Sequence, residues 1–228
     1  MPTARKLGIV IAAGGSGIRF GNTNKLFQNI CGLPVFIRSV RNFLSVCPGK
    51  NIVIPVADDH RDQFEQALEK YLPDCGVMLT QGGATRPESV MNGISALPKG
   101  LKWIAVHDAA RPLANAELLQ KCLEKAIEYG GAAPAKRVTD TIKQVNDDNI
   151  AVATVDRTVL RSIETPQIFN LEALKEAYES LGDAALEYTD DAGVFTACGG
   201  KVYLVDNPEP NVKLTFPEDL TLLEQLCK

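Results

Sequence analysis

The sequence predicts an α/β fold in which a mostly parallel sheet is covered by helices on both faces. Short apolar runs that suit buried strands alternate with longer amphipathic stretches that suit helices along most of the 228 residues. Such alternation is typical of parallel sheets whose strands are connected by helices. The length fits one domain with a sizeable core, which we assign to residues 1–228.

The expected strands and helices follow one another in order along the chain. Strands are predicted where short apolar runs contain β-branched residues, at residues 7–12, 51–56, 77–80, 102–106 and 201–205. Helices are predicted where apolar residues recur at helical spacing, at residues 33–44, 58–71, 86–97, 117–129 and 171–181, then from Asp190 or Asp191, and after Pro217. Strand and helix therefore alternate over the first 129 residues, as a parallel sheet requires.

Prolines and aspartates mark the ends of several of these elements. Pro34 suits the first turn of the helix at 33–44, where a proline gives up no helical hydrogen bond. Asp58 or Asp59 can cap the next helix. Pro55 lacks the N–H group that a central strand needs, so we expect it at the end of its strand.

Residues 134–165 depart from the alternating pattern and predict a β-arm subdomain. Residues 138–145 and 150–155 read as two alternating strands, and the turn-like sequence Asn-Asp-Asp-Asn lies between them. An isolated two-stranded ribbon is only marginally stable in water. We therefore expect the arm to protrude and to pack on a second copy of the chain.

Composition excludes several classes of function. The net charge of -4 argues against a general nucleic-acid or membrane binder, so an anionic ligand must be held by local cations. The six cysteines are scattered without a Cys-x-x-Cys pair, and only two histidines accompany them. This pattern indicates reduced, mostly buried thiols in a cytoplasmic protein, with neither a zinc site nor a disulfide framework. We expect no signal peptide and no membrane span.

A glycine-rich loop, Ala13-Gly14-Gly15-Ser16-Gly17, follows the first strand and precedes Arg19 and Lys25. Closely spaced glycines let the backbone approach a ligand, and its N–H groups can then form a cradle for an anion. The spacing matches neither standard phosphate loop, since Phe20 replaces the last glycine of the dinucleotide fingerprint and no Gly-Lys-Ser/Thr triplet occurs. The stretch is therefore either a triphosphate loop of a third kind or a tight turn.

Three unusual loops, at residues 13–25, 81–86 and 107–112, each follow a predicted strand. Ligands of parallel α/β sheets bind at the carboxyl ends of the strands. We therefore expect the three loops to converge on one rim of the sheet. Their convergence favours the nucleotide site over the tight turn.

An ordered set of motifs resembles the 2-C-methyl-D-erythritol 4-phosphate cytidylyltransferases over essentially the whole chain. The motifs are residues 13–19, Gly82-Gly83 with Arg86 and Ser89-Val90, 107–112, Asp140-Thr141, 155–157, 165–167, 189–192 and 211–215. Ribitol-5-phosphate cytidylyltransferases are close neighbours, but Ala110 and Arg157 favour the first family. The resemblance implies a Rossmann-like three-layer fold with a protruding β-arm that holds a homodimer together.

The resemblance also implies a reaction, in which CTP and 2-C-methyl-D-erythritol 4-phosphate give 4-diphosphocytidyl-2-C-methyl-D-erythritol and pyrophosphate. The implied cofactor is Mg²⁺, with Asp108 as the acid nearest to it or to the ribose. The implied catalytic residues are Arg19, Lys25, Arg157 and Lys213. The implied CTP contacts are Ala13, Gly14, Gly15, Ser16, Gly17, Gly82, Gly83, Ala84, Ser89, Asp108 and Ala109. The implied acceptor contacts are Arg111, Thr141, Arg157, Thr165, Thr189 and Lys213, with Thr141 and Arg157 reaching the pocket of the partner.

Two other functions remain open at this stage. The first is the same chemistry on ribitol 5-phosphate. The second is a CTP-binding protein without turnover, because Asn24-Lys25-Leu26 stands where the family usually has Pro-Lys-Gln. Asp191 likewise replaces the usual Glu. His107 is expected to order its loop through hydrogen bonds rather than to take part in chemistry.

Overall fold

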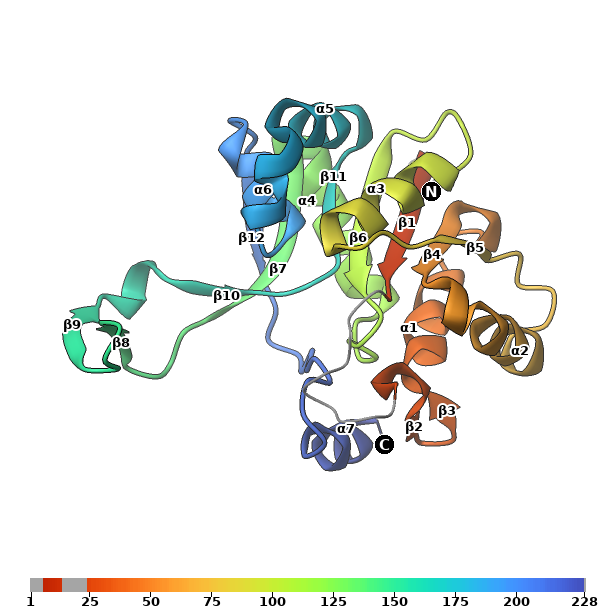
Figure 1. The fold of residues 1–228 in the computed structure, drawn as a ribbon, viewed down its shortest axis with the longest axis horizontal. Coiled ribbons are helices and arrows are strands. Elements are labelled where there is room, and N and C mark those ends of the chain that lie inside the picture. Colours follow the sequence, from red (N-terminus) through yellow and green to blue (C-terminus); the bar gives the residue numbers. More distant parts are fainter. Residues whose placement is uncertain (1–5, 14–23, 228) are drawn as a thin grey trace.

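The computed structural model describes residues 6–13 and 24–227, and the centre of the fold is one twisted sheet (Figure 1). Its strand order is β10-β7-β11-β6-β1-β4-β5. The parallel part consists of β1 (Leu7–Ala12), β4 (Ile52–Val56), β5 (Met78–Gln81) and β6 (Trp103–Asp108). All four were predicted, to within two residues at either end, and Pro55 is next to last in β4 as expected.

Three strands of the other half of the sheet were not predicted. They are β7 (Gly131–Arg137), β10 (Arg161–Ile163) and β11 (Gln167–Asn170). β11 runs antiparallel to both β6 and β7, and β12 (Val202–Asp206) runs parallel to β7. The sequence of β7, Gly-Ala-Ala-Pro-Ala-Lys-Arg, contains no β-branched residue, so its strand conformation comes from pairing on both sides rather than from local preference.

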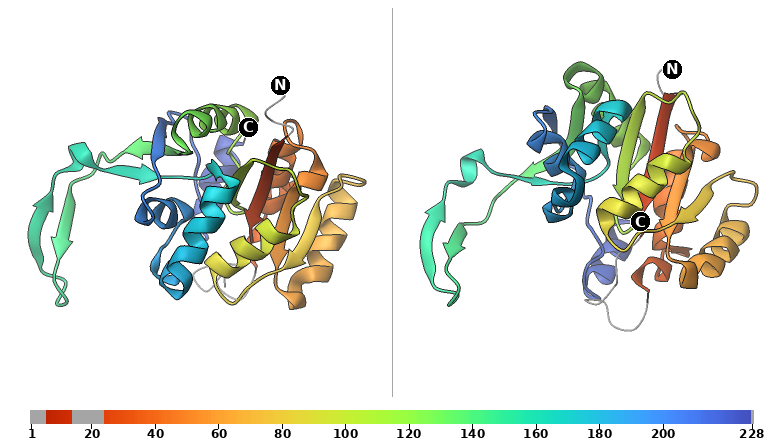
Figure 2. Two further views of the ribbon diagram at one scale, coloured as in Figure 1. Left: turned by 90° about the horizontal axis from the view of Figure 1, so that it is seen from above. Right: turned by 45° about the horizontal axis from the view of Figure 1, so that its top comes forward.

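Helices cover both faces of the sheet, which confirms the predicted three-layer α/β fold (Figure 2). One core contains α1 (Val35–Leu44), α2 (Arg61–Tyr71), α4 (Ala116–Tyr129) and α7 (Asp219–Leu226). The other contains α3 (Arg86–Ala96), α5 (Leu171–Leu181) and α6 (Asp191–Ala197). Along β1, Ile9 and Ile11 belong to the first core and Val10 to the second, because successive side chains of a strand point to opposite faces.

Most helix boundaries agree with the sequence, and two helices begin later than expected. α1 begins at Val35, because Leu33–Pro34 forms the short strand β3, which pairs with β2 (Asn29–Ile30). α2 begins at Arg61, after a single 3₁₀ turn at Asp58–His60. In both cases the first predicted residues form a different local structure that leads into the helix.

The predicted β-arm projects from the body of the molecule (Figure 1). Its strands β8 (Ile142–Val145) and β9 (Ala151–Val155) form a separate antiparallel sheet. Asn146 closes the turn, since its N–H donates to the carbonyl of Ile150 and its side-chain oxygen accepts from the N–H of Ile150. Residues at both ends of the predicted arm range lie instead in β7 and β10 of the main sheet, so the ribbon is shorter than 134–165.

All six cysteines are free thiols, as expected, but the expectation that most are buried is wrong. Only Cys47 and Cys122 are buried, whereas Cys31 and Cys198 are exposed. Cys31 lies at the turn between β2 and β3, and Cys198 follows the last residue of α6, so neither reaches a core. Within the described ranges, no helix combines the length and the apolar character needed to cross a membrane.

Candidate active site

Two of the three unusual loops meet at one rim of the sheet. β1 and β6 end side by side, with Ala12 opposite Asp108 in the register of the two strands. Arg86, at the start of α3, lies 3.8 Å from the Asp108 carboxylate, which joins the loop at 81–86 to the loop at 107–112. From the loop at 13–25, the predicted residues Gly14, Gly15, Ser16, Gly17 and Arg19 lie outside the described residues.

Asp108 is the centre of a cluster of charged side chains. Its Oδ2 lies 2.8 Å from Lys213 Nζ and 3.5 Å from Arg111 Nε, while its Oδ1 faces Arg86. Burial alone would raise the pKa of this carboxyl group, but Lys213, followed by Arg86 and Arg111, lowers it well below the usual range. Asp108 therefore stays ionised and holds three cations at one place.

Arg86 was quoted among the motifs but was not assigned to the site, and the structure places it there. Its Nη2 lies 2.7 Å from Oδ2 of Asp191, whose side chain is fully buried and whose Oδ1 accepts a hydrogen bond from the Tyr178 hydroxyl at 2.7 Å. Burial disfavours the charged guanidinium, yet Asp191 and then Asp108 raise the pKa of Arg86 above its usual value. Asp191, although its side chain is shorter than the usual Glu, thus contacts both Arg86 and Tyr178 directly.

A short C-terminal segment, residues 211–215, brings two lysines to the same rim. The N–H of Leu214 donates to the carbonyl of Ala110 at 2.8 Å, and Lys25 Nζ donates to the carbonyl of Leu214 at 2.8 Å. Lys213 directly precedes Leu214, which makes both of these contacts, and its Nζ is bound to Asp108. The predicted catalytic residues Lys25 and Lys213 are therefore neighbours in space although 188 positions separate them.

Asn211 fixes the start of this segment through its amide group. Its Nδ2 donates to Oε2 of Glu164 at 3.1 Å and to the carbonyl of Thr165 at 2.9 Å, and its backbone carbonyl accepts from Arg111 Nη1 at 2.8 Å. Arg111 is thereby held between Asp108 and Asn211. The predicted acceptor residue Arg111 thus belongs to the cluster.

Local charge at the rim is positive although the chain is acidic overall. Among the described residues, Arg86, Arg111 and Lys213 are three cations that contact the carboxylates of Asp108 and Asp191, and Lys25 lies close to them. Three positive charges against two negative ones leave a surplus of one in these ion pairs. An anion such as a phosphate would supply the charge that balances this surplus.

Thr165 and His107 hold the backbone of Asp108 in place through hydrogen bonds. The Thr165 hydroxyl oxygen accepts from the N–H of Asp108 at 3.0 Å and lies 3.0 Å from His107 Nδ1. His107 Nε2 lies 3.1 Å from the carbonyl of Arg111, which can only accept, so the imidazole carries its hydrogen on Nε2 and accepts from Thr165. His107 thus orders the loop, as expected, and the buried Thr165 acts on the site through Asp108.

The second glycine loop is ordered by Ser89. Its buried hydroxyl accepts from the N–H of Gly83 at 3.0 Å and donates to the carbonyl of Thr85 at 2.9 Å. Thr85 in turn caps α3 in a capping box with Glu88. Gly83 and Ala84 are left exposed on this fixed loop, where their backbone groups can meet a ligand.

Several predicted site residues lie outside the charged cluster around Asp108. Ala109 is fully buried and donates its N–H to the carbonyl of Ala12, so its side chain packs in the core. Thr189 is exposed just before Asp190, the residue that caps α6. Thr141 and Arg157 lie on the arm, where the Arg157 guanidinium donates to the carbonyl of Thr139. Within one chain, the structure does not bring these two arm residues to Lys213.

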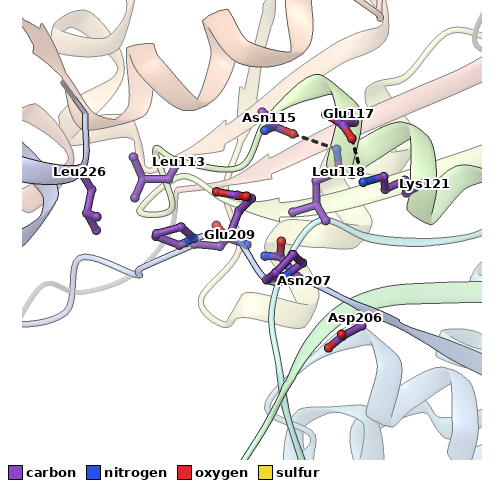
Figure 3. A pocket seen from close by; sticks show the side chains of 12 residues that line it. Leu113, Asn115, Glu117, Leu118, Lys121, Asp206, Asn207, Glu209 and Leu226 are labelled. Carbon is purple, nitrogen blue, oxygen red and sulfur yellow. Dashed lines mark hydrogen bonds and ion pairs between the residues drawn. The ribbon is translucent and has the colours of Figure 1, made fainter.

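A pocket of about 330 Å³ adjoins the cluster and shares Asn211 with it (Figure 3). Its other lining residues come from the loop before α4, from the first turns of α4, from residues 206–210 and from Leu226. Glu117, Asp206 and Glu209 make the lining acidic, and the one lysine, Lys121, is paired with Glu117 at 2.7 Å. The pocket therefore does not suit a phosphate, and it contains none of the predicted site residues.

Comparisons with known proteins agree on one family. The family model described as 2-C-methyl-D-erythritol 4-phosphate cytidylyltransferase matches residues 7–228. The chain belongs to this family. It is 36% identical to the enzyme of that name from Bacillus mycoides, over 95% of each chain, and 37% identical to that from Carboxydothermus hydrogenoformans, over 97% of this chain and 95% of the other. The predicted family and enzyme class, a nucleotidyltransferase, are therefore confirmed.

Solved structures of the family share the fold. The 4-diphosphocytidyl-2C-methyl-D-erythritol synthase of Anaerococcus prevotii superposes with a TM-score of 0.82 at 25% identity, covering 98% of this chain and 99% of the other. The 2-C-methyl-D-erythritol 4-phosphate cytidylyltransferase of Thermus thermophilus gives 0.78 at 28% identity, covering 97% and 98%. The whole chain, including the part that bears the arm, therefore follows the family fold.

The residues described hold no preformed metal site, since no three His, Cys, Asp or Glu side chains gather there. Asp108 contributes one carboxylate, and its Oδ1 has only the 3.8 Å contact with Arg86 among the described residues. A single rim carboxylate fits Mg²⁺ of the kind that is held mainly by substrate phosphates and water. The chemistry of the site is thus compatible with the predicted cofactor.

Buried His107 predicts a loss of stability in mild acid. Burial, against a smaller opposing effect of Asp108, lowers its pKa from 6.5 to about 4. Because the unfolded chain binds this proton more readily, the stabilisation is complete above about pH 6.5 and is lost as the pH falls towards 4, by about 3 kcal/mol. Denaturant unfolding across this range measures it.

The control for this prediction is His107→Gln, which keeps an amide donor and acceptor but does not titrate. Other carboxyl groups titrate in both proteins, so the difference between the two pH profiles isolates the histidine. Parallel profiles between pH 6.5 and 4 would contradict the assignment of a buried neutral imidazole.

Proposed function

We propose that the protein converts CTP and 2-C-methyl-D-erythritol 4-phosphate to 4-diphosphocytidyl-2-C-methyl-D-erythritol and pyrophosphate. The observation that carries the proposal is the cluster of Arg86, Arg111 and Lys213 around Asp108, with Lys25 beside it on the carbonyl of Leu214, on the rim where the family motifs meet. Relatives that bear the name of this activity match the chain over nearly their full length. None of these comparisons favours ribitol 5-phosphate or a protein without turnover.

The reaction is an in-line displacement at phosphorus. A phosphate oxygen of the acceptor attacks the α-phosphorus of CTP, a new P–O bond forms, and the bond to pyrophosphate breaks. A phosphate is already a nucleophile at neutral pH, so the site needs no general base. What the protein supplies is alignment and positive charge where negative charge accumulates on phosphoryl oxygens.

We assign the cations by their positions. Lys25, together with Arg19 of the glycine loop, would neutralise the triphosphate. Lys213 and Arg111, both held by Asp108, would bind the acceptor phosphate beside the α-phosphorus. Asp108 therefore orients both cations before the substrates arrive, which lowers the reorganisation needed in the reaction.

We assign a second role to Asp108 as the protein ligand of Mg²⁺, through the oxygen that faces away from Lys213. When bound, the metal would neutralise triphosphate oxygens and make pyrophosphate a better leaving group. Lys213 keeps the other oxygen of the carboxylate at 2.8 Å, so both partners can be held at once.

Selection of cytosine would rest on backbone groups of the loop at 82–84. A fixed carbonyl accepts a hydrogen bond from the N4 amino group of cytosine and repels the carbonyl that uracil has there. Ser89 holds this loop through Gly83 and Thr85. A contact made through the main chain explains why Ala84 can stand where family members often have Asp.

The arm would pair two chains into a homodimer. Its apolar side chains are unusually exposed, with Val159 at 76%, Ile150 at 60% and Val152 at 58%. A second copy would cover them and stabilise a ribbon that is marginal on its own. Thr141 and Arg157 would then complete the acceptor pocket of the partner.

Turnover assays with two acceptors test the proposed function. Purified protein, CTP and Mg²⁺ are combined either with 2-C-methyl-D-erythritol 4-phosphate or with ribitol 5-phosphate, and pyrophosphate release is measured. We expect release only with the first acceptor. Release only with ribitol 5-phosphate, or CTP binding without any release, would overturn the proposal.

Replacing Lys213 tests its catalytic role. Lys213→Ala removes a cation that touches the acceptor phosphate, so we expect kcat to fall at least ~100-fold while the protein folds normally. Lys175→Ala is the matched control, because Lys175 also pairs with a carboxylate, Glu172, but on the outer surface of α5. An unchanged rate for Lys213→Ala would remove this lysine from the mechanism.

Mixing two inactive variants tests whether the arm completes the site of the partner. Arg157→Ala and Lys213→Ala should each turn over poorly at low acceptor concentration. Mixed and re-equilibrated in equal amounts, they should recover about a quarter of the wild-type rate, because half of the dimers are mixed and each has one intact site. No recovery, with mixed dimers shown to be present, would place both residues in the same chain's site.

A further inference from the structure

Two cysteines from opposite ends of the sequence, Cys31 and Cys227, are brought close together by the packing of α7 on the β2–β3 hairpin. Cys31 lies at the turn of the β2–β3 hairpin, in the left-handed region with φ 48°, and its side chain is exposed. α7 packs beside β2 (Figure 1). Cys31 Sγ lies 3.6 Å from the carbonyl of Glu224 in α7, and Cys227 follows that residue by three positions, close to one helical turn.

The thiols of Cys31 and Cys227 are neighbours in the fold. Cys31 Sγ lies against the carbonyl of Glu224, one helical turn before Cys227, and, after burial, Cys31 is among the groups that raise the pKa of the Cys227 thiol. The other four cysteines have different surroundings: Cys47 and Cys122 are buried, Cys75 is half-buried, and Cys198 bonds to the carbonyl of Ala177. Cys31 and Cys227 are therefore a pair of described cysteines that the fold brings close together.

The two cysteines of the pair differ in how accessible their thiols are to solvent. Cys31 is exposed, so an external reagent reaches it first. Cys227 is half-buried against the core, and burial raises the pKa of its thiol, an effect that nearby Arg38 opposes. Cys31 is thus suited to initial attack, and Cys227 to the second step.

We propose that Cys31 and Cys227 are a redox modification site, which small disulfides of the glutathione class convert to an intramolecular disulfide. The Cys31 thiolate attacks one sulfur of the reagent, forming a mixed disulfide and releasing one thiolate. The Cys227 thiolate then attacks Cys31 Sγ, forming the protein disulfide and releasing the second thiolate. Two electrons pass from the protein to the reagent, and the two cysteine protons leave to solvent or to the released thiolates.

Oxidation would join two elements that flank the site lysines. The hairpin with Cys31 follows directly after Lys25, and α7 follows the segment with Lys213. Asp219 already ties α7 to that segment, since its Oδ2 accepts from the N–H groups of Thr215 and Phe216 at 2.8 Å. The disulfide would therefore fix α7 against the hairpin and close a loop that includes most of the chain. This inference does not depend on the proposed reaction.

Mass spectrometry after treatment with oxidised glutathione tests the proposal. The experiment uses full-length protein with Cys198→Ser, which removes the other exposed thiol. We expect a product that has lost two hydrogens and carries no glutathione, with a peptide linking Cys31 to Cys227. In the same background, Cys227→Ser should retain one glutathione on Cys31, and Cys31→Ser should form no link.

Thermal unfolding provides the second readout. The oxidised protein should melt at least ~4 °C higher than the reduced one, because the link restricts the unfolded chain, and dithiothreitol should reverse the shift. Glutathione that persists on Cys31 with Cys227 intact would overturn the proposal. So would failure of Cys31 to react, or a link between chains in place of the internal one.

Discussion

The ion pair between Asp108 and Lys213 is the contact on which the site depends. Asp108 is placed by the sheet, at the end of β6, whereas Lys213 lies on an irregular segment near the end of the chain. Arg111 and Arg86 contact the same carboxylate. One ionised side chain on a rigid strand therefore sets the positions of three cations that come from three separate parts of the sequence.

This arrangement explains how an acidic protein can attract a highly charged anion. A net charge of -4 repels an anion at long range, so affinity must come from cations concentrated at the rim. Placing like charges together is unfavourable unless carboxylates separate them. Asp108 and Asp191 do this while leaving a local surplus of positive charge, and they in turn are held by Thr165, which bonds to Asp108, and by Tyr178, which bonds to Asp191.

The sequence predicted those strands and helices whose conformation is set by residues close together in the chain. The β-branched run of β1 and the amphipathic residues of α5 were placed at their observed boundaries, since burial and helical spacing are visible in a short window. β7, which is rich in alanine, was missed, because its conformation comes from β10, β11 and β12 beside it. The pairing of Arg86 with Asp191 spans 105 positions, and no short window contains both.

The sequence likewise predicted some residues of the site but not the contacts between them. Motifs marked Asp108, Arg111, Lys25 and Lys213, and the structure gathers these four. What the motifs could not show is that Thr165 acts through Asp108, that the Ser89 hydroxyl is occupied in holding its loop, or that Cys31 lies against α7, just before Cys227. Each depends on side chains that meet only after folding.

A crystal structure with CTP and Mg²⁺ bound would test the central claim most directly. The triphosphate should lie against the rim, with its oxygens within hydrogen-bonding distance of Lys25 and its α-phosphorus beside the Asp108–Lys213 pair. A nucleotide bound elsewhere, with Asp108 and Lys213 facing only solvent, would contradict it.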